Sequence, residues 1–563
     1  MTHSPNERIK TASQGLRGTL AHGLTQHHTG AIAEDDQQLV KFHGMYLQDD
    51  RDLRPERTQK KLDKAYAFML RLRVPGGVVT PAQWLKLDAI ARDYAGDAIR
   101  LTTRQTVQYH GVIKTNLKAT MQAIDAAALD TLAACGDVNR NVLASTNPHV
   151  SAAHTQAYEL ATRISVDLLP HTGAYREIWL DGEPLIGEPE VEPIYGQTYL
   201  PRKFKAVVAV PPDNDVDVFA HDLGFIAIVG ASGAIDGWNV TVGGGMGMTH
   251  GEPDTFPRTS EPLGYCTPDQ TLAVAEAVMR VQRDNGNRSV RKHARLKYTI
   301  ERMGLDAFRQ EVERHLGYAL APAHGASFTG TGDRLGWHEA GGLWHYGLFV
   351  ENGRVTDTPD RRLMSGLRAI ANIHRCEFVL TANQNLMIAG VAAEDKASIE
   401  SALAEYSLDR GVSRLRQRAM ACVALPTCGL ALAESERYLP SLMAKLDALM
   451  AEAGLAEDEI VFRMTGCPNG CARPYLAEIA MVGRGPGRYH LYLGAAFDGT
   501  RLNKLYRRDV DEAAILAALG PLLHAYAADR QPGERFGDWS IRAGHVQATT
   551  AGNRFHEDLG EAA

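Results

Sequence analysis

The sequence contains an internal repeat whose two copies lie almost half the chain apart. Residues 99–112 read IRLTTRQTVQYHGV, and residues 378–391, which begin 279 positions later, read FVLTANQNLMIAGV. Five of the fourteen aligned positions are identical, where chance gives roughly one. The identical pairs are Leu101/Leu380, Thr102/Thr381, Gln105/Gln384, Gly111/Gly390 and Val112/Val391.

A shorter similarity follows in each copy, VTVG at residues 240–243 and LYLG at residues 491–494. The two similarities together predict two related halves, each opening with a strand–turn–strand unit, with ligands bound between them. The rest of the chain predicts mixed helix and strand. Helices are predicted to begin near Thr80, Thr267 and Leu439, and strands to cover residues 206–210, 225–229, 238–242 and 489–493.

Composition narrows the class of protein. A chain of 563 residues exceeds one hydrophobic core, so about two to four domains are expected. The net charge of −7 argues against a general nucleic-acid binder, and no run of eighteen apolar residues predicts a membrane span. The first residues lack the apolar core of a secretion signal. Seven cysteines in such a chain fit a reducing cytoplasm, where thiols bind metals rather than form disulfides.

Residues 1 to about 40 are polar and show no sustained hydrophobic period. This composition predicts a mostly disordered arm, with docking of a partner protein as the functional alternative.

Four of the seven cysteines form two pairs in turn-rich segments. Cys422 and Cys428 lie in CVALPTC, and Cys467 and Cys471 lie in TGCPNGC. Buried structural thiols would explain any one of them, but not their pairing in turns. Paired zinc ligands are usually two to four residues apart, so the five-residue gap argues weakly against zinc, and an iron–sulfur cluster fits at least as well. Spacing alone leaves zinc and a cluster both open.

Basic residues concentrate near predicted turns of this acidic chain. Examples are Arg71, Arg100, Arg104, Arg140 and the segment Arg202–Lys205. Solvated surface charges are the simplest interpretation of any single one. However, Lys203 and Lys205 alternate on an apparent strand and would point to one face, where they could bind a small dianion or a polycarboxylate.

Two further segments are weaker signals. Residues 288–302 are rich in Arg and Lys, which favours a solvated helix with some inward cations over a nucleic-acid helix. Residues 243–245 are three glycines, which indicate close approach of the backbone to a ligand as readily as a phosphate loop. No Rossmann fingerprint or flavin motif is present, so a redox enzyme of this sequence would receive its electrons from a partner.

Ten segments carry a resemblance to a known family over almost the whole chain. They are KFHGMYLQDDRD, RVPGGVVT, IRLTTRQTVQYHG, NRNVLASTNP, QTYLPRKFK, VTVGGG, TGTGDRLGW, LTANQN, CVALPTC and TGCPNGC. The chain resembles the sulfite/nitrite reductase family, and within it the haemoprotein subunits of assimilatory NADPH-dependent sulfite reductases.

The resemblance implies a 4Fe–4S cluster on Cys422, Cys428, Cys467 and Cys471, with Cys471 also bridging to the iron of a sirohaem. It implies anion binding by Arg71, Arg140, Lys203 and Lys205. It further implies that the sirohaem or its pocket is contacted by Arg100, Thr102, Arg104, Gln108, His110, Arg202, Arg295, Gln384 and Asn469. The chain departs from the family pattern at Gly429, where Pro is expected, and at Ala472, where Gly is common.

The implied fold is α+β, a pseudo-twofold duplicated sulfite/nitrite reductase fold with ferredoxin-like half-domains and mixed α/β sirohaem-binding domains. The implied domains are an N-terminal partner-docking arm (1–68), a first ferredoxin-like half-domain (69–133), a first sirohaem- and substrate-binding domain (134–333), a second ferredoxin-like half-domain (334–407) and an iron–sulfur and sirohaem-binding domain (408–563).

The implied activity is the cytoplasmic six-electron reduction of sulfite to sulfide in cysteine biosynthesis, with electrons from NADPH through a flavoprotein alpha subunit carrying FAD and FMN. Two alternatives remain, a nitrite reductase of the same family and a non-catalytic 4Fe–4S electron carrier or zinc-stabilised binding protein. Lys205 favours sulfite, because nitrite reductases of this family tend to carry Asn there.

Overall fold

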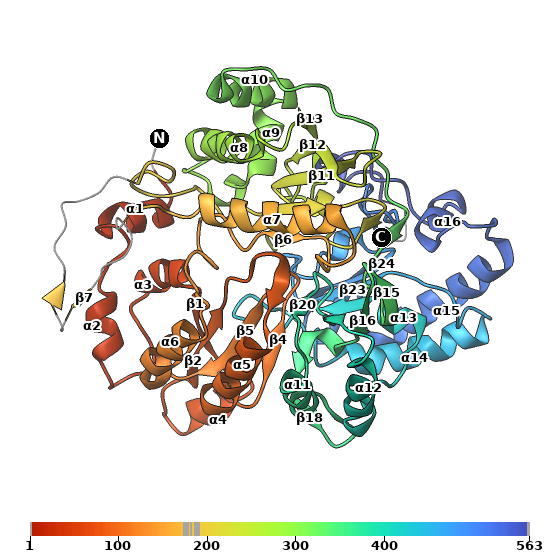
Figure 1. Cartoon of the computed structure of the whole chain (residues 1–563), viewed down its shortest axis with the longest axis horizontal. Helices are drawn as coiled ribbons and strands as arrows, with labels where there is room; N and C mark the ends of the chain where they lie inside the picture. Colours follow the sequence, from red (N-terminus) through yellow and green to blue (C-terminus); the bar gives the residue numbers. More distant parts are fainter. Residues whose placement is uncertain (1–2, 173–178, 181–182, 185–191, 560–563) are drawn as a thin grey trace.

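The computed structural model describes residues 3–172, 179–180, 183–184 and 192–559 (Figure 1). Four five-stranded sheets organise this part of the chain, two from each half. The first two are antiparallel throughout, in the orders β1-β2-β5-β4-β17 and β15-β16-β21-β20-β3. Their strands are β1 (Met45–Asp49), β2 (Tyr66–Arg71), β3 (Val78–Val79), β4 (Ile99–Leu101), β5 (Val107–Val112), β15 (Gly336–Ala340), β16 (Leu343–Leu348), β17 (Arg354–Val355), β20 (Phe378–Leu380) and β21 (Leu386–Val391).

The predicted repeat is confirmed as two equivalent hairpins, β4–β5 and β20–β21. The two halves also exchange an edge strand. The short strand β17 of the second half pairs with β4, and β3 of the first half pairs with β20. Each ferredoxin-like sheet is therefore completed by the other half, which ties the two copies together.

Helices pack against these sheets in matching positions. They are α5 (Pro81–Tyr94) and α6 (Leu117–Ala126) in the first half, and α11 (Leu363–Ala371) and α12 (Lys396–Glu405) in the second. The predicted start of α5 is confirmed, because Thr80 and Gln83 form a reciprocal capping box and Pro81 stands at the first helical position. The α5 helix packs on α11, and Arg368 Nε lies 2.7 Å from Asp88 Oδ2 across that contact.

The other two sheets have the orders β6-β9-β11-β12-β13 and β22-β23-β24-β25-β26. In both, the first three strands run parallel and the last two antiparallel. Their strands are β6 (Leu143–Ala144), β9 (Ala206–Ala209), β11 (Leu223–Val229), β12 (Ile235–Val242), β13 (Glu261–Cys266), β22 (Ala419–Ala421), β23 (Phe462–Thr465), β24 (Ile479–Gly485), β25 (Arg488–Leu493) and β26 (Lys504–Val510). The shorter sequence similarity falls on β12 and β25, which occupy equivalent positions, so the duplication extends through these sheets.

Helices cover these sheets as well. They are α7 (Ala152–Asp167), α8 (Thr271–Asn285), α9 (Leu296–Met303) and α10 (Leu305–Leu316) in the first half, and α13 (Arg414–Gln417), α14 (Leu439–Glu452), α15 (Glu512–Asp529) and α16 (Phe536–Arg542) in the second. The predicted α14 buries Leu439, Leu442 and Leu446 at helical spacing. Three two-stranded sheets of short segments are also found among the described residues. They pair β7 (Trp179–Leu180) with β8 (Glu183–Pro184), β10 (Asp213–Asn214) with β14 (Gly330–Thr331), and β18 (Asp357–Thr358) with β19 (Arg361–Arg362).

The expectation of a disordered N-terminal arm is wrong for residues 3–40. This segment forms α1 (Pro5–Ala12), α2 (Leu20–Thr25) and α3 (Asp36–Leu39), and α4 (Arg54–Gln59) follows. Leu16 and Leu20 join the main core, and buried Lys10 lies 3.4 Å from Asp137. The order of this segment comes from tertiary contacts that its own polar composition does not reveal.

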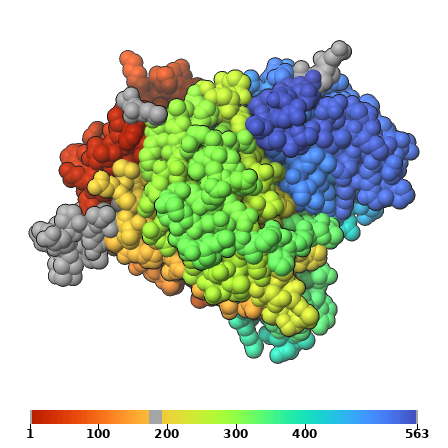
Figure 2. All heavy atoms as spheres, turned by 90° about the horizontal axis from the view of Figure 1, so that it is seen from above, coloured from red at the N-terminus to blue at the C-terminus, as the bar shows by residue number. Residues whose placement is uncertain are grey.

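The arrangement of the chain is visible from a second side. Figure 2 shows residues of about 220–330 (yellow-green to green) between the N-terminal segment (red) and the C-terminal segment (blue). One large apolar cluster runs from Leu16 to Leu408, and a second occupies the C-terminal domain from Leu415 to Val546. In the described residues, no helix combines the length and apolar composition that crossing a bilayer requires.

Candidate active site

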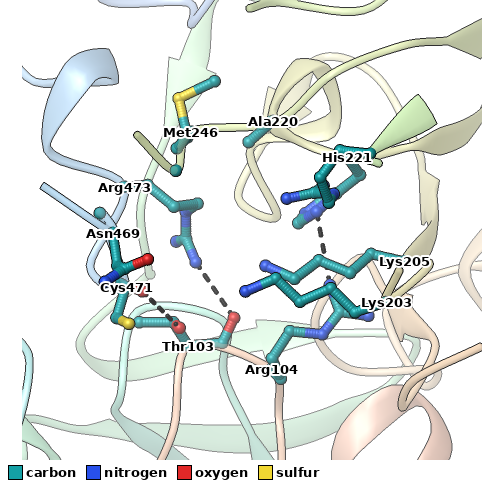
Figure 3. Close-up of a pocket in the computed structure, with 13 residues that line it drawn as sticks. Thr103, Arg104, Lys203, Lys205, Ala220, His221, Met246, Asn469, Cys471 and Arg473 are labelled. Atoms are coloured by element: carbon teal, nitrogen blue, oxygen red, sulfur yellow. Dashed lines mark hydrogen bonds between the residues drawn. The ribbon is translucent and has the colours of Figure 1, made fainter. Parts of the chain in front are cut away.

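A cavity lies where turns from both halves meet (Figure 3). Six of the predicted site residues line it: Arg104, Lys203, Lys205, Arg295, Asn469 and Cys471. The remaining lining residues are Thr103, Ala220, His221, Met246, Gly247, Gly470 and Arg473. Cations and one cysteine therefore dominate its chemistry.

The turn of the first repeat is fastened to the second cysteine loop. Thr103 Oγ1 donates a hydrogen bond to the Cys471 carbonyl oxygen at 3.1 Å, and Arg473 Nη1 donates to the Thr103 carbonyl oxygen at 3.1 Å (Figure 3). Arg473 Nη2 also donates to the Ala382 carbonyl oxygen at 2.9 Å, in the turn of the second repeat. A single guanidinium thus joins the cysteine loop to both copies of the hairpin.

Arg473 is held in place by a buried carboxylate. Its Nε lies 2.5 Å from Asp217 Oδ2, and the same oxygen lies 2.7 Å from Arg463 Nη1. All three side chains are at most 5% exposed. Such a buried ionic group is strongly destabilised by removal of one member, so the position of the Cys471 loop depends on it.

Lys203 and Lys205 extend side by side into the cavity (Figure 3). They do not stand on a strand as expected, because β9 begins only at Ala206, but both face the same cavity as predicted. Burial and the charges of Arg202 and Arg295 lower the pKa of Lys203, and burial with the charges of Lys203 and Arg104 lowers that of Lys205.

The two ammonium groups have no hydrogen-bond or ion-pair partner among the described residues. In residues 3–172, 179–180, 183–184 and 192–559, no hydrogen bond or ion pair joins either of them to another side chain or carbonyl. The charged form of each lysine is therefore unfavourable until an anion enters the cavity. An anion between the two ammonium groups would favour their charged forms.

Arg104 and Arg295 are oriented by neighbouring groups. Arg295 forms a bidentate pair with the buried Asp222, at 3.2 and 2.7 Å. Arg104 Nη1 lies 3.4 Å from His221 Nδ1, whose Nε2 lies 3.1 Å from the Val216 carbonyl oxygen. The contact with the carbonyl oxygen places the ring proton on Nε2, which leaves Nδ1 as the acceptor. His221 Nδ1 therefore orients the Arg104 guanidinium.

The four paired cysteines form no disulfides, and they interact electrostatically with one another. Burial raises the pKa of Cys422 to about 12, of Cys467 to about 12 and of Cys428 to about 11, and the charge of Cys471 adds to each shift. The Gly466 N–H donates to Cys422 Sγ at 3.3 Å, and Asn469 Nδ2 donates to Cys467 Sγ at 3.6 Å. These donors suit thiolates, because hydrogen bonds to sulfur tune a bound cluster.

The spacing of the sulfurs bears on the alternatives of zinc and a cluster. Tetrahedral Zn–S bonds would place sulfurs about 3.8 Å apart. In the described part of the chain, no three of the four sulfurs lie within 4.8 Å of one another. Four cysteine thiolates are the usual ligand set of a 4Fe–4S cluster.

The other predicted site residues lie outside the cavity lining. Arg71 Nη1 donates to Cys135 Sγ at 3.0 Å, and Arg140 Nε donates to the Gly136 carbonyl oxygen at 2.9 Å. Arg202 lies 3.9 Å from Asp137, and Arg100 Nη2 donates to the Ala421 carbonyl oxygen at 2.9 Å. Arg71 and Arg100 nevertheless interact electrostatically with Cys471.

The four remaining predicted contacts serve neighbouring groups. Gln108, with its amide oxygen facing Arg71, accepts from Arg71 Nε at 2.9 Å, and His110 Nδ1 lies 3.2 Å from Gln48 Oε1. Thr102 stabilises the first repeat turn, where the Arg104 N–H donates to Thr102 Oγ1 at 3.1 Å, and Gln384 Nε2 donates to the Ala421 carbonyl oxygen at 2.9 Å.

The sequence analysis missed His221 and Arg473. Arg473 stands two residues after Cys471 in the same turn-rich segment, and this position could have indicated that it lies near the site. His221 lies in a segment without any motif, so only the structure brings it to the cavity.

Comparisons with known proteins agree with this geometry. The model described as nitrite/sulfite reductase ferredoxin-like half domain matches residues 59–127 and again residues 338–406. The model described as nitrite and sulphite reductase 4Fe-4S domain matches residues 159–320. A protein of Methylobacterium radiotolerans named sulfite reductase (NADPH) hemoprotein beta-component is 65% identical over 99% of this chain and 91% of its own length. The chain belongs to the nitrite/sulfite reductase family.

A second relative is similar in sequence over the whole chain, and a solved structure shares the fold. A protein of Chromohalobacter salexigens with the same name is 59% identical over 98% of this chain and 97% of its own length. The solved structure of the Mycobacterium tuberculosis NirA protein superposes with a TM-score of 0.77 at 24% identity, over 97% of both chains, and shows the shared fold. The 4Fe-4S model matches the first of the duplicated domains, whereas the paired cysteines of this chain lie in the second.

Proposed function

We propose that the chain reduces sulfite to hydrogen sulfide as the haemoprotein component of an assimilatory NADPH-dependent sulfite reductase. The observation that carries this proposal is the pair of unpartnered lysines, Lys203 and Lys205, beside Cys471 in the cavity between the halves. The names of the close relatives point to the same reaction. The electron donor is a flavoprotein alpha subunit that takes electrons from NADPH, and the reaction serves cysteine biosynthesis in the cytoplasm.

Two cofactors complete the site in this proposal. Cys422, Cys428, Cys467 and Cys471 would hold a 4Fe–4S cluster, and Cys471 would also ligate the iron of a sirohaem. When bound, these groups would relay the donor's electrons and provide the iron at which sulfite is reduced. Arginine side chains suit the many carboxylates of a sirohaem, and the buried Arg104 Nε, which lacks a hydrogen-bond partner among the described residues, fits that role.

The chain's own residues supply charge and protons. Each oxygen of sulfite leaves as water, so every S–O cleavage consumes protons and needs charge neutralisation. Lys203 and Lys205 would bind sulfite oxygens and donate protons, and their lowered pKa brings them closer to the pH at which a general acid is effective.

Arg71 and Arg140 stay in the proposal as anion-binding residues. Arg71 interacts electrostatically with Cys471, and Arg140 with Lys203, although neither lines the cavity. To bind the substrate, Arg71 would turn away from the Cys135 thiol and Arg140 from the Gly136 carbonyl oxygen.

The remaining predicted contacts support the cofactors. Arg100, Thr102, Gln108, His110, Arg202, Arg295, Gln384 and Asn469 would hold the sirohaem or shape its pocket. Arg295 and Asn469 already line the cavity.

The decisive experiment compares sulfite with nitrite. We expect Lys205→Asn to lower kcat/KM for sulfite by about 100-fold relative to nitrite, since one preorganised charge is lost. Steady-state turnover with a reduced dye as donor measures both substrates, and Lys118→Asn on the exposed face of α6 is the matched control. An unchanged ratio would contradict the role of Lys205, and nitrite turnover without sulfite turnover in the wild type would favour the nitrite reductase alternative.

A further inference from the structure

A second group of metal-ligating side chains lies apart from the cavity. His149 Nε2 lies 2.8 Å from Glu377 Oε2 and 3.5 Å from Cys376 Sγ, and Cys376 Sγ lies 2.6 Å from the same carboxylate oxygen. These three atoms all lie within 4.8 Å of one another, and none of the three residues lines the cavity.

The two halves of the molecule contribute different members of this group. His149 lies in the loop that follows β6, where its N–H donates to Asn147 Oδ1 at 3.1 Å. Cys376 and Glu377 lie directly before β20 of the second ferredoxin-like half-domain, and the Ala389 N–H donates to the Glu377 carbonyl oxygen at 2.9 Å. Hydrogen bonds of the His149 N–H and the Glu377 carbonyl oxygen therefore fix the backbone on both sides of the group.

The donor set is that of a zinc site with an open position. Thiolate, imidazole and carboxylate are all zinc ligands, and tetrahedral bonds of about 2.0–2.3 Å place ligand atoms about 3.2–3.8 Å apart. The observed separations of 2.6, 2.8 and 3.5 Å need to widen by less than about 1 Å to reach that geometry.

The protons present in the group occupy the place that a cation would take. Glu377 Oε2 accepts from the Cys376 thiol and faces the His149 ring nitrogen, so one carboxylate oxygen compensates two donors. A divalent cation would replace both shared protons and bind all three atoms at once. His149 is 28% exposed and Glu377 31% exposed, which leaves room for water as a fourth ligand.

We propose that His149, Cys376 and Glu377 form a zinc site, with water as the fourth ligand, that ties the loop after β6 to the second ferredoxin-like half-domain. The site cross-links the two halves of the duplicated fold outside the catalytic cavity, and its expected role is to stabilise their packing.

A matched pair of glycines tests the position of the thiol. A methyl group at Gly390 would lie 2.3 Å from Cys376 Sγ, whereas a methyl group at the equivalent Gly111 would meet nothing within 4 Å. Both glycines have positive φ, at +70° and +82°, so alanine strains both backbones alike. Gly390→Ala should displace the sulfur and weaken zinc binding, and Gly111→Ala should leave it unchanged.

The direct experiment measures zinc affinity of the holoenzyme in a titration against a chromogenic chelator, with iron content followed to show that the cluster cysteines stay occupied. We expect one zinc per chain in the wild type and an affinity loss of more than about 100-fold in Cys376→Ser, beyond the loss typical of an outer hydrogen-bond partner. Cys266→Ser, which changes a buried thiol on β13, should bind zinc as the wild type does.

Two results would overturn the proposal. One is a wild type that takes up no zinc at micromolar concentration, and the other is a Cys376→Ser variant that binds zinc as tightly as the wild type. A wild-type thermal midpoint that rises with zinc, and a Cys376→Ser midpoint that does not, would support the stabilising role.

Discussion

The two copies of the repeat hairpin have the same scaffold and different chemistry. In the first turn, the Arg104 N–H donates to Thr102 Oγ1 at 3.1 Å, and in the second the Asn383 N–H donates to Thr381 Oγ1 at 3.1 Å. Gln105 and Gln384 both adopt positive φ. Their side-chain amides donate to the carbonyl oxygens of equivalent β-strands, at Ala144 (2.8 Å) and Ala421 (2.9 Å).

The copies differ at the tip of the turn. The first presents Thr103 and Arg104 to the cavity, where Arg104 adds a cation. In the second copy, Asn383 stands at the position of Arg104 and does not line the cavity. Its Nδ2 donates to Asp333 Oδ1 at 2.8 Å and to the Asp215 carbonyl oxygen at 3.0 Å. Positions that are identical between the copies therefore maintain the turn, and positions that differ carry the function.

Exchanging the tips gives the largest expected effect. Arg104→Asn places the residue of the second copy in the first, removes a buried cation from the cavity and leaves the Thr102 contact intact. We expect kcat/KM for sulfite to fall about 100- to 1,000-fold, because one preorganised charge is lost. Turnover with sulfite measures this change.

Asn383→Ser is the companion variant for that exchange, since Asn383 does not line the cavity and reaches it only through the bond that Arg473 Nη2 donates to Asn383 Oδ1 at 3.4 Å. It should lower stability and leave kcat/KM within about threefold of the wild type. Equal losses of kcat/KM in both variants would break the proposed division between scaffold and chemistry.

The exchanged edge strands predict a symmetric loss of stability. A methyl group at Gly77 would lie 2.3 Å from the Leu380 carbonyl oxygen, and one at Gly353 would lie 2.3 Å from that of Leu101. Both glycines have positive φ. We expect Gly77→Ala and Gly353→Ala each to lower the free energy of unfolding by ~2–3 kcal/mol. Denaturant unfolding measures both, and a large effect in only one of them would show that the halves are not equivalently interlocked.

The two glutamines should differ by a smaller amount. Gln105 makes two bonds to Ala144, since the Ala144 N–H also donates to Gln105 Oε1 at 3.0 Å. The Gln384 Oε1 is buried without a hydrogen-bond partner among the described residues. We expect Gln105→Ala to lower the free energy of unfolding by ~1–2 kcal/mol, and Gln384→Ala to lower it by less. A larger loss in Gln384→Ala would contradict this ranking.

A buried carboxyl in each half makes stability depend on pH. Burial raises the pKa of Asp215 to about 7 and of Glu478 to about 7. Between about pH 4 and pH 7 the folded state holds protons that the unfolded state has released, so stability falls as pH rises through this window. Asp215→Asn should reduce that slope by at most about 1.4 kcal/mol per pH unit. A slope that is unchanged in unfolding measured at several pH values would contradict the protonation of Asp215.

Local sequence patterns predicted much of the fold. The repeat predicted both hairpins, Thr80 and Gln83 predicted the start of α5, and the leucine spacing predicted α14. These features are readable because hydrophobic period, capping and turn chemistry act over a few residues. Two cysteine pairs and two lysines also predicted where the chemistry lies.

Long-range contacts account for what the sequence did not reveal. The exchanged strands β3 and β17 are two residues long, too short for a periodic pattern. The helix α1 is held by Lys10 against Asp137, whose carboxyl also lies 2.9 Å from Arg291. Such contacts join residues far apart in the chain, so no local pattern predicts them.

Thr102 and Gln384, each identical to its counterpart in the other copy of the repeat, illustrate a related limit. Their match to family motifs predicts contact with a sirohaem. In this structure, Thr102 accepts a hydrogen bond within its turn, and Gln384 joins its turn to β22. A motif identifies residues that matter together, and it does not separate those that bind a cofactor from those that hold the backbone around it.

The absorption spectrum of the purified protein tests the central claim most directly, namely that the cavity beside Cys471 holds a sirohaem coupled to a 4Fe–4S cluster. The account predicts a Soret band together with a red chlorin-like band. A protein that shows neither band, while it is folded and contains its cysteines in reduced form, would contradict the account.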